Sequence, residues 1–142
     1  MLVNGTKLGY ATSSGSAYTD LAGLKEVPDM GAEPELVDNT ALSDSIIHNE
    51  LGIGDAGDME YTFRFVNTSG SAYRNLKARE GVLTWFKHEL NDPLTGAGTH
   101  HGTQYTFSGY PSVRISGGGV NDPQEFVLTI ALQSDITITD PA

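Results

Sequence analysis

The 142-residue chain contains no cysteine and no long apolar run, and these absences limit what it can be. Without cysteine it has neither disulfides nor thiolate metal sites. No segment approaches the roughly 20 apolar residues of a membrane-spanning helix, and the first 20 residues hold no apolar run of signal-peptide length. We therefore expect no contact with a membrane, and a protein that stays in a reducing cytosol or leaves it without secretion.

Positive charge is also scarce. Eight Lys and Arg residues stand against 18 Asp and Glu residues, which gives a formal net charge of −10. Residues 20–61 hold eleven of the acids and one base, Lys25, so this third of the chain carries the whole net charge. Charge of this kind governs association and solubility rather than fold, and a surface so acidic should repel nucleic acid.

Hydrophobic periodicity predicts a single, mainly β domain. Residues 58–66 alternate most clearly, with Met59, Tyr61 and Phe63 on one side and Glu60 and Arg64 on the other. Residues 125–132 alternate in the same way, and further strands are expected at 21–27, 35–39, 82–90, 103–115 (broken near 109–111) and 136–139. One helix is expected at 69–80, begun by a serine cap and ended at a glycine. The pattern indicates an antiparallel β-sandwich or open barrel with one flanking α-helix.

Two segments show no period. Residues 1–19 are rich in Gly, Ser and Thr, which predicts a flexible N-terminal arm, either loose or ordered on a neighbouring subunit. Residues 39–57 are polar and predict a long loop, and loops of this length in small domains are either functional or disordered. Residues 52–57 match G-x-G-x-x-G, but the expected strand follows them instead of a helix, and Asp55 and Asp58 would repel a pyrophosphate. A nucleotide site is therefore not expected.

No catalytic or metal-binding pattern is present. The four histidines are His48, His88, His100 and His101, and the last two are adjacent, so they would face opposite sides of an extended chain. No serine lies in a G-x-S-x-G turn, and no calcium-loop spacing occurs. The sequence predicts no enzyme activity, no catalytic residues, no metal and no cofactor.

Several patterns in order carry a family resemblance. They are LKEVPD at 24–29, Gly31, Pro34-Glu35, TALSD at 40–44, DMEYTFRF at 58–65 and GVNDPQEFVLTIALQSDITI at 119–138. Together they span almost the whole chain, and none is catalytic. In this order they resemble the major tail tube proteins of long-tailed, siphophage-type bacteriophages.

The resemblance implies a β-sandwich with a flanking helix and a structural virion protein. Such a protein polymerises as stacked hexameric rings into a tail tube through which the genome is ejected, with DNA passing unbound. It also implies tape-measure, tail-terminator and distal tail proteins as partners, with the protein in the host cytoplasm before assembly and in the virion tail afterwards. The alternatives are a monomeric β-sandwich binding module, for example for carbohydrate, and a small hydrolase. The first would need exposed loop aromatics, which 39–57 lacks, and the second lacks a catalytic set.

A tube subunit leads to three site predictions. An acidic wall would repel DNA, so part of the acidic segment should face the lumen. The loop at 39–57 should contact a neighbouring subunit, and the positive charges of the predicted helix should meet a neighbour's acidic segment. The lumen residues are Glu26, Glu33, Glu35, Asp38 and Glu60; the contact residues are Ile46, Ile47, His48, Leu51 and Ile53; the basic face is Arg74, Lys77 and Arg79.

Overall fold

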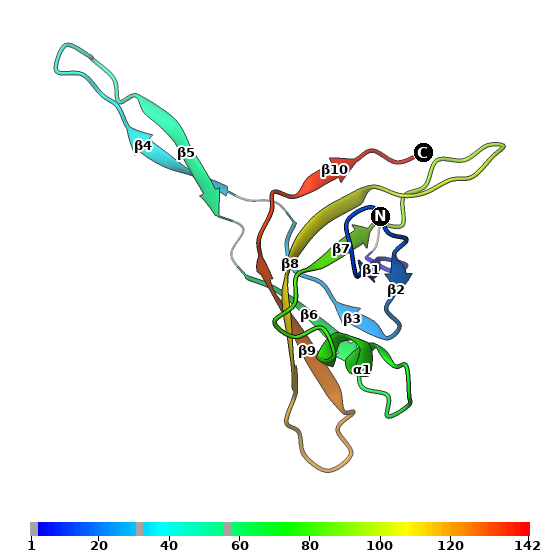
Figure 1. Ribbon diagram of the computed structural model, residues 1–142. Coiled ribbons are helices and arrows are strands. Elements are labelled where there is room, and N and C mark those ends of the chain that lie inside the picture. The colour runs from blue at the N-terminus through cyan, green and yellow to red at the C-terminus, as the bar shows by residue number, and fades with distance from the viewer. Residues whose placement is uncertain (1–2, 31–32, 56–57) are drawn as a thin grey trace.

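The computed structural model describes residues 3–30, 33–55 and 58–142 (Figure 1). In chain order the elements are β1 (Lys7–Ala11), β2 (Thr19–Asp20), β3 (Leu24–Glu26), β4 (Glu33–Asp38), β5 (Asn49–Asp55), β6 (Asp58–Arg64), α1 (Ala72–Lys77), β7 (Thr84–Glu89), β8 (Gln104–Ile115), β9 (Glu125–Leu132) and β10 (Thr137–Thr139). Every strand pairing is antiparallel. The expected fold, mainly antiparallel β-strands with one α-helix, is confirmed for the described residues.

Eight strands form one sheet that curves into a half-barrel. Its order is β2-β1-β7-β8-β9-β6-β3, with β10 paired to the first part of β8. The strand β8 changes neighbours along its length: residues 104–109 pair with β7, and residues 109–115 pair with β9. The expected break in this strand at 109–111 is wrong. Pro111 can stay within the strand because β7 ends opposite Gly109, so this stretch of β8 needs no donor on that side.

The core lies on one side of the sheet, where the alternation placed it. Met59, Tyr61 and Phe63 of β6 are fully buried, and so are Phe126 and Leu128 of the neighbouring strand β9. The rings of Phe63 and Phe126 stack with their centroids 5.0 Å apart. Burial of this aromatic and aliphatic surface is the main force that holds the sheet in its curved form.

The helix α1 closes one end of the core. It is shorter than the expected 69–80 and begins after Ser71, whose side chain makes no capping hydrogen bond. Gly81 has a φ of +73°, the left-handed conformation expected after the helix. Leu76 is fully buried, and the Tyr73 ring packs edge-on against Phe65 and Phe126.

The N-terminal segment is part of the sheet, so the prediction of a flexible arm over 1–19 is wrong for its central part. Strand β1 pairs with β7 over five residues, and its Leu8 is fully buried opposite His88. The segment lacks the usual alternation of apolar and polar residues because a glycine, Gly9, occupies the position of β1 that faces away from the core. A Cβ there would lie 3.2 Å from Cβ of Tyr18, so glycine allows residues 18–20 to cover the strand.

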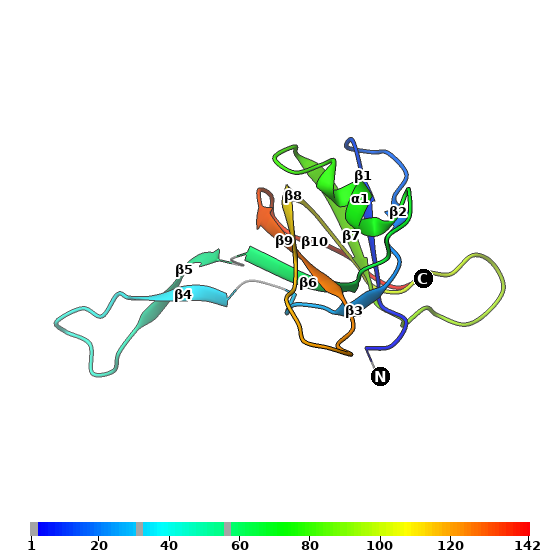
Figure 2. The same ribbon diagram turned by 90° about the horizontal axis from the view of Figure 1, so that it is seen from below.

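The segment 39–57 is only partly a loop. Residues 39–48 form a tip, and β5 follows and pairs with β4 as a two-stranded sheet of its own. Figures 1 and 2 show this hairpin, in cyan to green, projecting away from the half-barrel. The strand was missed because β5 contains two glycines, which are unfavourable in strands, and because its sequence shows no alternation of apolar and polar residues.

Candidate assembly surfaces

The tip of the β4–β5 hairpin is ordered by its own polar groups. One carboxylate oxygen of Asp38 accepts hydrogen bonds from the Thr40 amide at 3.0 Å and from the Thr40 hydroxyl at 2.6 Å, and these bonds lower the pKa of Asp38. Asp44 accepts a bond from the Ala41 amide at 2.7 Å, and the His48 amide donates to the Thr40 hydroxyl at 2.9 Å. Such side-chain bonds to the backbone replace the ladder bonds that a turn lacks.

This ordered tip presents aliphatic side chains to solvent. Leu42 is completely exposed, and Ile46 and Ile47 are 66 % and 73 % exposed. Leu36 and Val37 of β4 are also largely exposed. Exposed aliphatic residues concentrated on one projection are typical of a surface that another protein covers.

The expected contact residues fall partly within this surface. The structure places Ile46, Ile47 and His48 at the tip, where all three are exposed. The side chains of Leu51 and Ile53 lie outside the described part of the molecule, although both residues belong to β5. Sequence reasoning missed Leu36, Val37 and Leu42; the available signal was their aliphatic character within an otherwise acidic stretch.

The five acids predicted to face a lumen are divided between two places. Glu26 and Glu60 lie on exposed positions of the half-barrel sheet, in β3 and β6. Glu33, Glu35 and Asp38 belong to β4 in the separate hairpin, and the side chains of Glu33 and Glu35 lie outside the described part. Glu60 is also close to a base, with 3.8 Å between its Oε1 and Nη2 of Arg114. The structure therefore does not unite this set in one acidic surface.

The three bases at the helix have different surroundings. Arg79 donates to the Thr84 hydroxyl at 3.1 Å and to the Leu83 carbonyl at 2.8 Å, so its guanidinium holds the turn after α1. Lys77 forms an ion pair with Glu80 at 3.2 Å. Arg74 donates to Asn67 at 2.9 Å. Only Arg74 and Lys77 of the three are exposed.

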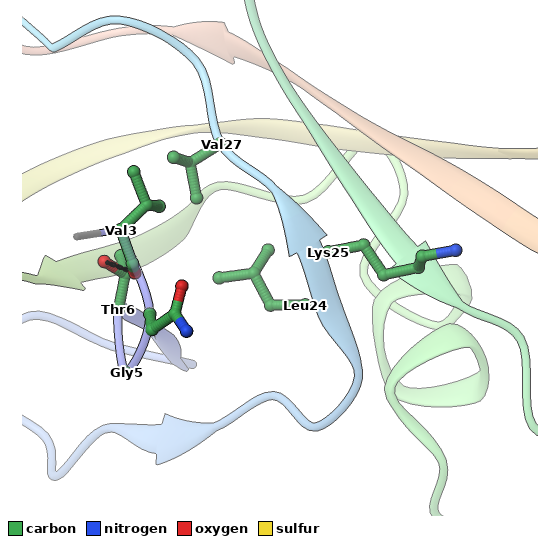
Figure 3. A pocket seen from close by; sticks show the side chains of 7 residues that line it. Val3, Gly5, Thr6, Leu24, Lys25 and Val27 are labelled. Atoms are coloured by element: carbon green, nitrogen blue, oxygen red, sulfur yellow. Dashed lines mark hydrogen bonds between the residues drawn. The ribbon is translucent and has the colours of Figure 1, made fainter.

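A hollow lies where the half-barrel remains open between the segment before β1 and strand β3 (Figure 3). Its volume is about 390 Å³, and it is lined by Val3, Asn4, Gly5, Thr6, Leu24, Lys25 and Val27. Figure 3 shows the Lys25 side chain pointing along the sheet, away from Val3. There Nζ of Lys25 forms an ion pair with Glu125 at 2.8 Å. The side chains around the hollow include no nucleophile paired with a base.

A second hollow of about 190 Å³ reaches the buried His88 and also contacts Met30, Leu90 and Tyr105. Burial lowers the pKa of His88 to about 4. Its imidazole is hydrogen-bonded within the core rather than directed at an acid or a nucleophile. Among the described residues, no group of three or more His, Asp or Glu side chains is arranged to hold a metal ion. No helix in that part of the chain is long and apolar enough to cross a membrane.

This chain matches known proteins in its fold but not in its sequence. No protein-family model matches this chain, and no curated protein matches its sequence. Solved structures do match. One is a chain of the cryo-EM structure of the anti-feeding prophage baseplate, 6-fold symmetrised, with a TM-score of 0.70 at 12 % identity over 95 % of this chain and 92 % of that chain. The chain therefore has a tail-tube-like fold.

Two further structures agree with this assignment. A chain of the cryo-EM structure of an extracellular contractile injection system, the PVC sheath/tube terminator in its extended state, matches with a TM-score of 0.67 at 9 % identity, over 98 % of this chain and 96 % of that one. The tail of an empty GTA particle, refined with C6 symmetry, matches with a TM-score of 0.56 at 20 % identity, over 94 % and 93 %. Because the matches cover nearly all of this chain and nearly all of the matched chains, the similarity extends over the whole domain.

Proposed function

We propose that this chain is a structural subunit of a phage-like tail, which polymerises as stacked six-fold rings into the tail tube. The observation that carries the proposal is the projecting hairpin, with its ordered tip and its exposed Leu42, Ile46 and Ile47. A monomer gains nothing from presenting these residues to water, whereas a neighbouring copy can cover them. The fold supports the proposal, since the similar chains belong to particles with baseplate, tube-terminator or tail parts, two of them described with six-fold symmetry.

The sheet edges also suit a ring. The eight-stranded sheet ends in the short strands β2 and β3, and neither has a second partner strand among the described residues. Free strand edges invite pairing with another chain, and head-to-tail contacts that close on themselves produce rings. In such a ring the sheets of neighbouring subunits would surround a channel, and the hairpin would contact the adjacent subunit or the next ring.

The sequence resemblance adds the finer parts of the proposal. These are a siphophage-type tail, genome ejection through the channel without specific DNA binding, and contacts with tape-measure, tail-terminator and distal tail proteins. The subunit would then stand in the host cytoplasm before assembly and in the virion tail afterwards. Glu26 and Glu60 remain the candidates for channel-facing acids on the sheet, and Arg74 and Lys77 for the basic contact face.

Electron microscopy and size-exclusion chromatography of the concentrated protein test the proposal, with rings or tubes as the expected result. The decisive variant is Leu42→Ser/Ile46→Ser/Ile47→Ser, which should fold normally and fail to polymerise. The matched control is Val120→Ser/Ile138→Ser, which removes exposed aliphatic residues outside the hairpin and should polymerise like the unmodified chain. A chain that stays monomeric at high concentration, with neither rings nor tubes, would contradict the proposal and favour a monomeric binding module.

A further inference from the structure

One face of the sheet has no covering element among the described residues. On strands β6, β9 and the second half of β8, the residues that alternate with the core side chains point away from the core. The cross-strand register aligns Glu60, Thr129 and Ser112 in one row across this face. Short hydroxyl side chains and charges are the groups that a protein leaves in contact with water. We call this surface the open face.

The charges on the open face nearly cancel. Together with the adjoining edge strand β3, it carries four acids and three bases, and so has one net negative charge: Glu26, Asp58, Glu60 and Glu125 against Lys25, Arg64 and Arg114. Lys25 lies 2.8 Å from Glu125, and Arg114 lies 3.8 Å from Glu60. Exposed pairs of this kind add little to stability, but opposite charges this close cancel each other's field within one Debye length, about 8 Å.

The acidic excess of the chain lies elsewhere. The hairpin at 33–55 contains six acids and neither Lys nor Arg. A strongly acidic chain and a nearly neutral open face are therefore compatible, because the hairpin extends away from the half-barrel (Figures 1 and 2).

We propose that the open face lines the channel of the tube, and that this wall is charge-balanced rather than acidic. The inference rests on the proposed function. Each subunit would place one net negative charge on the wall. The negative electrostatic potential in the channel would therefore not grow steeply as rings are added. A wall of this kind has no excess of bases to bind phosphates by counterion release, and it repels a polyanion only weakly. Duplex DNA could then pass without being gripped and without a strong electrostatic barrier.

The absence of cysteine makes the location of the open face measurable. Ser112→Cys introduces a thiol at an exposed position of the open face, and Ser69→Cys introduces one on the loop before α1. In free subunits, a maleimide on a large polyethylene glycol chain should label both. In assembled tubes it should label only the variant at Ser69, while a small maleimide labels both. Equal labelling of both variants in tubes by the large reagent would place the open face outside and overturn the inference, although the tubes themselves would still support the proposed function.

The charge of the wall is read from the same Ser112→Cys tubes with two small thiol reagents, cationic trimethylammonioethyl and anionic sulfonatoethyl methanethiosulfonate. The cationic reagent's reaction rate divided by that of the anionic reagent is compared for the thiol in the tube and for free mercaptoethanol in solution. For a balanced wall, the two ratios should agree within about threefold. Adding Lys25→Gln and Arg114→Gln should then raise the preference for the cationic reagent by about fivefold. A preference above about tenfold without those substitutions would mean an acidic wall and overturn the inference. If no polymer forms, the proposed function fails, and this inference fails with it.

Discussion

The hydroxyl oxygen of Tyr61 lies 2.9 Å from Nδ1 of His88 in the middle of the core, joining strand β6 to strand β7 across the half-barrel. Both residues are almost completely buried. Burial raises the pKa of Tyr61 above its usual range and lowers the pKa of His88 to about 4. The phenol therefore keeps its proton at neutral pH and can donate a hydrogen bond to the neutral imidazole, which satisfies two buried polar atoms.

The first prediction is that stability falls as the pH is lowered from about 6.5 to about 4. The pKa of His88 is near 4 in the folded chain and near 6.5 in the unfolded chain, so only the unfolded chain gains this proton within that window. The part of this loss that comes from His88 should be at most about 3 kcal/mol and should end near pH 4, below which carboxyl groups with a lowered pKa, such as Glu80, continue to reduce stability. Urea unfolding at a series of pH values measures it. His88→Gln should flatten the curve, and the exposed-histidine control His48→Gln should not; an unchanged slope in His88→Gln would contradict the assignment.

The second prediction concerns the close approach of β8 to β9. A Cβ at Gly109 would lie 2.6 Å from the Ala131 carbonyl oxygen and 2.6 Å from Cγ2 of Ile130. Because backbone cannot yield easily, Gly109→Ala should lower the free energy of unfolding by about 1–3 kcal/mol. Gly117→Ala is the matched control, since a Cβ there would meet nothing within 4 Å. Equal stability of the two variants in chemical denaturation would contradict the packing at this crossing.

The third prediction concerns the edge of β8 beyond the end of β7. There the Val113 amide donates to Oε1 of Glu80 at 3.0 Å, and this bond is the main cause of the lowered pKa of Glu80. Glu80→Ala should make the Val113 amide exchange with solvent roughly tenfold faster, because no strand of the described part of the chain pairs with β8 on that side. Glu80→Gln keeps an acceptor and should preserve most of the protection. Hydrogen exchange followed by NMR distinguishes them, and equal protection in both variants would mean that another group covers the edge.

The fourth prediction concerns the hairpin tip. Asp38→Ala/Asp44→Ala removes the acceptors that hold the Thr40 and Ala41 amides, so the tip should lose its fixed shape while the half-barrel keeps its stability. Polymerisation should then slow, because ordering the tip becomes part of the cost of association. Light scattering measures the rate, and Asp135→Ala/Asp140→Ala is the control that removes the same charge elsewhere. Equal rates in the two variants would show that tip order does not matter for assembly.

The sequence alone determined the elements that bury one face. Strands β6 and β9 alternate strictly, because their inward residues fill the core while their outward residues remain in water. The turn at Gly81 was also visible, since glycine adopts a positive φ at little cost. At the candidate surface, Ile46 and Ile47 could be identified because aliphatic residues in a polar segment need a reason to be exposed.

Only the tertiary structure decided the remaining features. Strand β1 exists because β7 provides its partner and because Gly9 lets residues 18–20 lie against it. The hairpin exists because β5 pairs with β4 in a two-stranded sheet that is separate from the half-barrel sheet. The acids that form one cluster in the sequence are separated, since Glu60 lies beside Arg114 on the sheet while Asp38 caps the distant tip. Strand pairing and charge neighbours are contacts between residues far apart in the chain, so a local pattern cannot contain them.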